Sequence, residues 1–167
     1  MTSNNRLPAM GGAAWQGAAL DPLADPALYD GIRWRRVFGY VVDLALIGFV
    51  SLVVWFLLAV AGVASFGLLL PLLPIGVALV PLAYHTLQVA SPRSATVGMR
   101  LFDVEVRAWT GTRPDLWQAF LMTALFLVTV ALTGSLILLV SLFNGRGRTL
   151  HDYLSGTVVV RASLIAG

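Results

Sequence analysis

The sequence predicts an all-α integral membrane protein with two transmembrane helices plus a third hydrophobic hairpin or span, and with a small cytoplasmic two-stranded ribbon. The first observation is compositional: of 167 residues, 58% are hydrophobic and only 11% are charged, and the mean hydropathy is +0.84. Soluble domains have about half apolar and a quarter charged residues, so this composition indicates a membrane protein. The other observations are long uncharged stretches and two short segments with strand-like character.

Charge and cysteine content exclude several classes of protein. The net charge of +3 comes from arginine alone, because the chain has no lysine, and the arginines flank apolar stretches, where topology signals lie. We therefore expect no nucleic-acid partner, although the pI is near 10.0. The lack of cysteine excludes disulfides and thiolate chemistry. Residues 1–31 have no signal-peptide core and carry Asp-Pro turns, which predicts a flexible N-terminal tail before a membrane domain over residues 32–163.

The first predicted span, residues 37–64, contains one carboxylate, Asp43, seven residues after Arg36. About 20 apolar residues cross the ~30 Å hydrocarbon core of a bilayer. Seven residues make about two helical turns, so Arg36 and Asp43 should project from nearly the same face, with the two charges coupled. An intramembrane carboxylate is a candidate functional site by default. Asp43 is then either a protonatable group on an ion or proton pathway, or a structural partner of Arg36 or of a neighbouring helix.

The second predicted span, residues 68–90, contains three prolines and should form an antiparallel hairpin with the first, because the turn between them is short and uncharged. At ~1.5 Å per residue, His85 and Asp43 lie roughly 9–10 Å below the same membrane interface, so a contact between them fits the geometry. Histidine titrates near neutral pH and is a common proton relay. The alternative is a histidine that makes an interhelical hydrogen bond without titrating.

Two short segments predict the ribbon. In residues 101–109, Val104, Val106 and Ala108 alternate with charged residues, which is typical of a half-exposed strand, and a turn follows. Residues 157–160 form a second strand-like run. A lone short strand is marginally stable, so we expect the two to pair.

The region between the strands, residues 116–143, has no charged residue and forms either one tilted span or two half-length helices turning near residues 133–135. Four arginines precede the first span, four lie in residues 91–114, three follow position 144, and none lies in the turn between the spans. The positive-inside rule places these basic regions in the cytoplasm, which requires an even number of crossings. We therefore favour a re-entrant hairpin, with both termini cytoplasmic, over a plain third span.

A resemblance to a known family rests on two segments: RRVFGYVVDLALI, which contains Arg36 and Asp43, and GRTLHDYLSGTVVVR, which contains Asp152. Together they resemble the RDD family of small bacterial membrane proteins, named for one arginine and two aspartates, over about residues 33–161. Arg36, Asp43 and Asp152 match the three naming positions. The flanking positions that match are Thr96, Gly98, Gly156 and Thr157, and the departures from the family pattern are Gly39, Val97, Met99 and Met122.

Asp152 has two compatible interpretations. Thr149 and Asp152 fit a capping box, in which a hydroxyl and an acidic side chain satisfy the first amides of a helix, and Gly156 then ends that helix. The resemblance instead suggests that Asp152 folds back against Arg36. Arg33, Arg35, Arg146 and Arg148 are expected to be solvated anchors that attract anionic lipid headgroups.

The resemblance implies a multi-pass protein of the bacterial inner (plasma) membrane and, for some family members, cation/proton antiport. One hypothesis is therefore exchange of a monovalent cation against a proton, with Asp43, Arg36, His85 and Asp152 on the pathway. Three spans are few for such a carrier, so transport would require a homo-oligomer. The alternative is a non-catalytic membrane scaffold or assembly partner in which these residues are structural. Without a nucleophile, base and metal set we expect no enzyme, no cofactor and no metal site.

Overall fold

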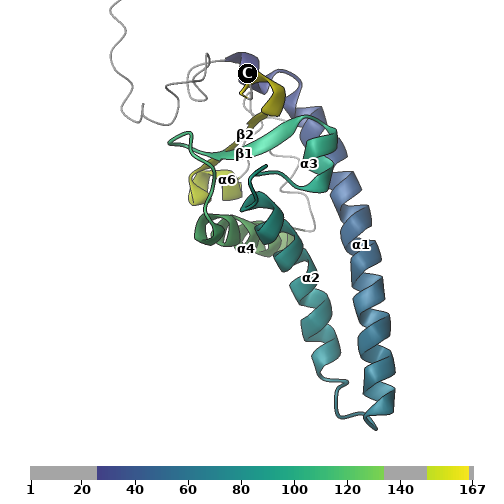
Figure 1. The fold of residues 1–167 in the computed structure, drawn as a ribbon. Coiled ribbons are helices and arrows are strands. Elements are labelled where there is room, and N and C mark those ends of the chain that lie inside the picture. Colours follow the sequence, from purple (N-terminus) through teal and green to yellow (C-terminus); the bar gives the residue numbers. More distant parts are fainter. Residues whose placement is uncertain (1–25, 134–149, 166–167) are drawn as a thin grey trace, which may run out of the picture.

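The structure is a computed structural model that describes residues 26–133 and 150–165 (Figure 1). Its elements, in chain order, are η1 (Pro26–Tyr29), α1 (Ile32–Ala64), α2 (Leu72–Val89), α3 (Val97–Leu101), β1 (Val104–Ala108), α4 (Leu116–Thr133), α6 (Leu150–Ser155), β2 (Thr157–Arg161) and η2 (Ala162–Leu164).

The predicted helical hairpin is present, with α1 and α2 packed side by side and antiparallel (Figure 1). Within the described part of the chain, these are the two helices that are long and apolar enough to cross a membrane. Ser65 closes the turn between them: its hydroxyl donates to the carbonyl of Gly62 at 3.0 Å and accepts from the amide of Leu69 at 3.1 Å. We call residues 43–85 the stem and the other described residues the head.

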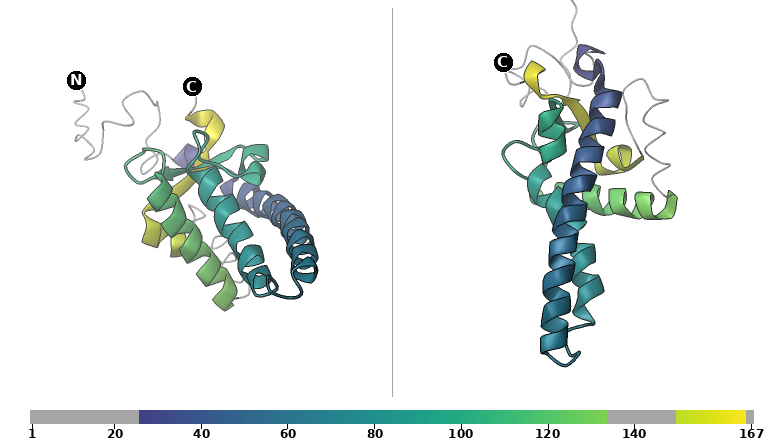
Figure 2. Two further views of the ribbon diagram at one scale, coloured as in Figure 1. Left: turned by 60° about the horizontal axis from the view of Figure 1, so that its bottom comes forward. Right: turned by 90° about the vertical axis from the view of Figure 1, so that its right-hand side faces the viewer.

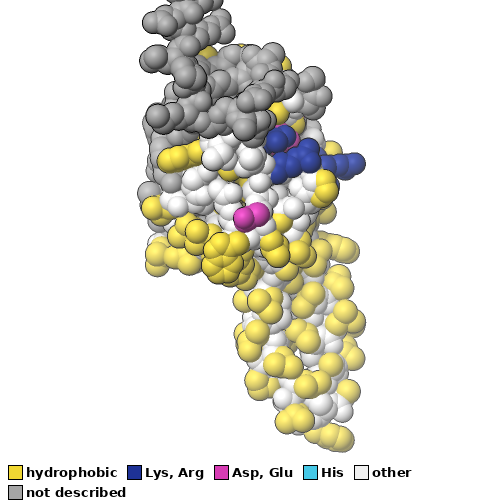
Figure 3. Space-filling model, turned by 60° about the vertical axis from the view of Figure 1, so that its left-hand side comes forward, with side chains coloured by type: hydrophobic (Ala, Val, Ile, Leu, Met, Phe, Trp, Pro, Cys, Tyr) yellow, Lys and Arg dark blue, Asp and Glu magenta, His cyan; other side chains and the backbone are white. Residues whose placement is uncertain are grey.

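The stem is apolar on its outside. Figure 3 shows hydrophobic side chains along the whole length of the stem and no charged side chain on its visible face, while arginine side chains gather on the head. Moving apolar surface from water into lipid is favourable by about 25 cal/mol per Å² of apolar area. This favours insertion of the stem into a bilayer.

The predicted ribbon is also present: β1 pairs antiparallel with β2, in a register that runs from Val104 opposite Arg161 to Ala108 opposite Thr157. The expectation of a half-exposed strand is wrong. Glu105 on the charged face of β1 is buried as well, and its carboxylate pairs with Arg107 two residues along the same face at 2.6 Å. Side chains two apart share one face of a strand, so the two charges neutralise each other.

The core of the head joins the ribbon to the start of α1 and to the end of α2. Its buried members are Leu28, Tyr29, Ile32, Val89, Val104, Val106, Ala119, Met122, Val158, Val159 and Val160. Leu28 and Tyr29 lie in the segment that we expected to be a flexible tail, so the folded part begins before Ile32. The cause is a long-range contact: η1 packs against β2, far along the chain, and buries these two large side chains.

Helix α4 runs across the stem rather than along it, in both the first view and the view turned by a right angle (Figures 1 and 2). It packs against α2 and α6 at the head. Of the predicted turn near residues 133–135, only Thr133 is described, as the last residue of α4, and the rest of the third apolar region lies outside the described residues. The choice between a re-entrant hairpin and a plain span is therefore still a sequence-based prediction.

Candidate functional site

Asp43 is the buried carboxylate at the junction of stem and head, with 2% of its surface exposed. One carboxylate oxygen, Oδ1, accepts from the Tyr84 hydroxyl at 2.7 Å and from the Gly98 amide at 2.8 Å. The other oxygen, Oδ2, accepts a short hydrogen bond from the Thr96 hydroxyl. A side chain of α1 thereby holds both α2 and the segment that opens α3.

The segment around α3 is built to reach this carboxylate. Thr96 is the N-cap of α3, where its hydroxyl oxygen accepts from the Met99 amide at 3.2 Å. Gly98 then lies directly against α1: a Cβ atom there would be 2.0 Å from the Gly39 carbonyl oxygen and 2.8 Å from the Asp43 carboxylate. Only a residue without a side chain lets the Gly98 amide approach Asp43 this closely.

The hydrogen bonds in this network all run toward Asp43. Tyr84, Thr96 and Gly98 each donate, and an ionised carboxylate is an acceptor that donates nothing. A buried carboxylate with three donors has the partners that a buried charge requires. The arrangement therefore suits a carboxylate that fastens three chain segments together.

Tyr84, and not the neighbouring His85, bonds to Asp43. Successive residues on a helix point about 100° apart, so a helix that turns Tyr84 toward α1 turns His85 away from it. The His85 ring lies instead against Phe126 of α4, with ring centroids 5.4 Å apart. The expected direct contact between Asp43 and His85 is thus replaced by one from Tyr84.

Sequence reasoning missed Tyr84, although a signal was available. Tyr84 and Gln88 are four residues apart, which places two polar side chains on one face of α2. His85 lies off that stripe.

Arg36 pairs with Asp152, its Nη1 atom 2.8 Å from Oδ2 of the carboxylate. The side chain of Arg36 is 12% exposed and that of Asp152 is 0% exposed. The expected direct coupling of Arg36 to Asp43 is therefore wrong. The two residues are roughly 10 Å apart along α1, and helical side chains tilt toward the N-terminus, so Arg36 reaches away from Asp43 and toward α6.

The short helix α6 brings Asp152 to this position. Gly156 follows the helix with a φ of +65°, as predicted for the residue that ends it. Thr149 lies outside the described residues, so the capping box is still a prediction, whereas the contact between Asp152 and Arg36 is present.

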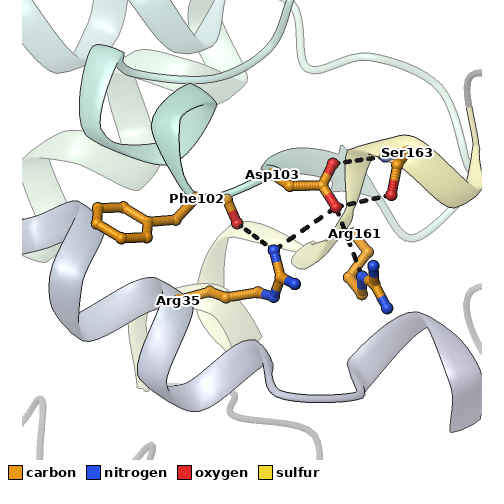
Figure 4. Close-up of polar contacts among 5 residues, drawn as sticks. All are labelled: Arg35, Phe102, Asp103, Arg161 and Ser163. Carbon is orange, nitrogen blue, oxygen red and sulfur yellow. Dashed lines mark hydrogen bonds and ion pairs between the residues drawn. The ribbon is translucent and has the colours of Figure 1, made fainter.

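A second polar cluster surrounds Asp103, between α3 and β1 (Figure 4). Its carboxylate accepts from the Ser163 amide at 2.8 Å and from the Ser163 hydroxyl at 2.7 Å. Arg35 lies 3.6 Å and Arg161 3.5 Å from the same carboxylate, and Arg35 also donates to the Phe102 carbonyl at 2.8 Å. Arg35 is therefore a link between α1 and the ribbon, not the solvated anchor that the sequence suggested.

The Asp103 cluster fixes the charge state of its carboxyl group. Burial alone would raise the pKa of Asp103, but the hydrogen bonds from Ser163 and the charges of Arg161 and Arg35 outweigh it and hold the pKa below the ordinary 3.8. Sequence reasoning missed this cluster because Ser163 lies 60 residues and Arg35 lies 67 residues from their partners along the chain. A single sequence carries no signal for such a contact.

Within residues 26–133 and 150–165, no group of three or more metal-ligating side chains comes together. The comparisons with known proteins give one result. A model of the RDD family matches residues 32–156, a range that includes Arg36, Asp43 and Asp152. No curated protein and no solved structure matches the chain.

Proposed function

This chain belongs to the RDD family and has two apolar helices of membrane-spanning length, and from that premise we propose that it is a membrane scaffold without catalytic activity. In this proposal, Arg36, Asp43 and Asp152 are structural: Asp43 fastens α1 to α2 and α3, Arg36 and Asp152 fasten α1 to α6, and the head is a platform for assembly at the membrane. One observation carries the proposal, namely that each of these charged groups bonds across elements.

The bonding of Asp43 supports a structural role over an exchanging one. An exchanging carboxylate must release its partners to bind a proton or a cation, whereas Asp43 accepts from three donors on two other segments. Losing the whole carboxylate would leave the Gly98 amide and the Thr96 hydroxyl without this acceptor, and an unsatisfied buried group costs about 1–3 kcal/mol.

The position of Asp43 along α1 is a second support. From Asp43 to Ala64, the end of α1, the helix rises roughly 32 Å, which alone exceeds the ~30 Å hydrocarbon core. A stem that crosses the bilayer therefore leaves Asp43 at the boundary with the head. Carrier sites lie near the bilayer midplane instead.

Cation/proton exchange is the second candidate, favoured by one observation. Asp43 is a buried carboxylate whose surroundings include the titratable groups of Tyr84 and His85. In that case the transported species is a monovalent cation against a proton, and the carrier is a homo-oligomer. Both candidates place the protein in the bacterial inner membrane, against anionic lipid headgroups.

Flux measurements distinguish the two candidates. The purified protein would be reconstituted in liposomes that contain a pH-sensitive dye, and sodium or potassium gradients would then be imposed. We expect no proton flux from the wild type or from Asp43→Asn. The Asp43→Asn variant should instead show faster hydrogen exchange in residues 95–108, because the Asn amide replaces one acceptor of the network. Asp103→Asn is the control variant. If the wild type and Asp103→Asn carried proton flux and a folded Asp43→Asn protein did not, the carrier would be established and the scaffold rejected.

A further inference from the structure

We propose that α4 lies flat in the interface between head and membrane, with one apolar face in the lipid, rather than crossing the bilayer. This inference does not depend on whether the protein is a scaffold or a carrier. It concerns the surface through which the head contacts the membrane and names the lipid of the adjoining leaflet as the occupant of that surface.

The first observation is that α4 has two different sides. Ala119, Met122 and Thr123 are buried on the side that packs against the head and α2. On the same helix, Gln118 donates to the Ser155 carbonyl of the α6 end at 3.1 Å. These contacts fix which side of α4 the protein covers.

The opposite side of α4 is apolar and exposed. Trp117, Leu121, Val128 and Leu132 fall within about 60° of one another around the helix at 100° per residue. Trp117 is 72% and Leu132 is 81% exposed, and both ends of the stripe are therefore open. An exposed apolar stripe of this kind marks a contact surface for protein or membrane.

The second observation is the direction of α4. It runs crosswise to the stem in two perpendicular views (Figures 1 and 2), so a stem that crosses the bilayer leaves α4 along the membrane plane. Figure 3 shows apolar side chains continuing from the stem onto the adjoining edge of the head, the region where Figure 1 places α4. The apolar surface of the stem and that of the head are thus one surface.

The third observation sets the depth. Phe126, in the middle of α4, contacts the rings of Tyr40 and His85 at 6.0 Å and 5.4 Å. From Tyr40 to Ala64, at the far end of the stem, α1 rises roughly 36 Å, more than the ~30 Å core. With the stem spanning the core, α4 lies at the edge of the hydrocarbon, where interfacial helices bury an apolar face and where tryptophan is enriched.

The chain has no cysteine, which allows a direct test by single-cysteine spin labelling of the full protein. Cysteine would replace Trp117, Leu121, Val128 or Leu132, and each labelled variant would be reconstituted in phosphatidylcholine–phosphatidylglycerol vesicles. Collision rates with oxygen and with a water-soluble nickel complex then report the depth of each label. Leu57→Cys in the stem is the deep reference, and Thr112→Cys in the loop after β1 is the aqueous reference.

We expect the four α4 positions to report one shallow depth, between the two references and equal within a few ångströms. A depth that changes steadily from position 117 to 132, by roughly 22 Å for a helix rising 1.5 Å per residue, would show that α4 crosses the bilayer and would overturn the proposal. Labels as accessible as the one at Thr112 would show that water covers this face. Labels that neither reagent reaches would show that protein covers it. Either result would also overturn the proposal.

Discussion

At the scale of single residues, two glycines leave no room for a side chain between α1 and α3. Gly39 on α1 and Gly98 on α3 bring two backbones together, and the Asp43 carboxylate lies beside that contact. The sequence contains both glycines but does not predict that they are in contact, because they lie far apart along the chain. The roles of the family positions Thr96 and Gly98 follow from this geometry: one caps α3 and both donate to Asp43.

Gly98→Ala should destabilise the protein strongly. The added Cβ would lie 2.0 Å from the Gly39 carbonyl oxygen, which is backbone and cannot rotate away. Overpacking of a core typically costs about 1–3 kcal/mol, and we expect at least the upper end of that range here. Thermal unfolding in detergent measures the effect. Gly48→Ala on α1 is the matched control, since a Cβ atom added there would have nothing within 4 Å. Equal melting temperatures for the two variants would contradict the tight contact.

The Asp103 cluster predicts an acid-sensitive contribution to stability. Because the pKa of Asp103 is held below the ordinary 3.8 in the folded protein, its stabilisation is present above that value and is lost as the pH falls through the lowered folded pKa. Unfolding measured from neutral pH down to pH ~2 should therefore show a smaller loss of stability in Asp103→Asn than in the wild type. Ser163→Ala, which removes one donor, should fall between them, and identical pH profiles for all three proteins would refute the cluster's role.

At the scale of elements, long-range pairs fasten secondary structures that the sequence predicts one by one. The apolar lengths predicted α1 and α2, and the period of two predicted β1 and its pairing with β2. Both signals are local, so a single sequence contains them. The partners of Arg35, Arg36 and Asp43 are set by how the elements pack, and helix periodicity alone led to the wrong partner for two of the predicted contacts.

The pair of Arg36 and Asp152 joins α1 to α6 across 116 residues of chain and should show strong coupling. Removing one partner of a buried pair leaves an uncompensated charge, typically at a cost of about 3–5 kcal/mol. Arg36→Gln and Asp152→Asn should each destabilise the protein, and the double variant should lose clearly less than the sum. Unfolding in a mild detergent measures the loss in free energy of unfolding of each of the three variants relative to the wild type.

Arg36→Gln combined with Gly48→Ala is the control for this double-mutant comparison. The effects of mutations at distant sites on the free energy of unfolding add to within about 0.5 kcal/mol, so these two should be additive. Strict additivity of the Arg36 and Asp152 changes would mean that the ion pair contributes nothing to stability.

At the scale of the whole molecule, the sequence predicted the apolar hairpin and the two-stranded ribbon but not the direction of α4. A charge-free helix has the same composition whether it crosses a bilayer or lies along it, and only its packing against α2 and α6 distinguishes the two. The two strands constrain topology more firmly. Since β1 and β2 pair, residues 104–108 and 157–161 lie on the same side of the membrane, whatever path the chain takes between them.

This pairing gives the last prediction, which concerns membrane sidedness. The loop after β1 and the end of the chain should share one side, and the turn between α1 and α2 should lie on the other. The described arginines all lie in the head and no arginine lies in that turn, so the positive-inside rule predicts a cytoplasmic head. Thr112→Cys and a cysteine added after Gly167 should therefore react with an impermeant maleimide only in permeabilised cells, whereas Leu68→Cys, exposed in the turn, should react in intact cells. Reversed labelling at all three positions would overturn the arginine argument and leave the fold intact, but labelling of Thr112 and the C-terminus from opposite sides would be incompatible with the sheet itself.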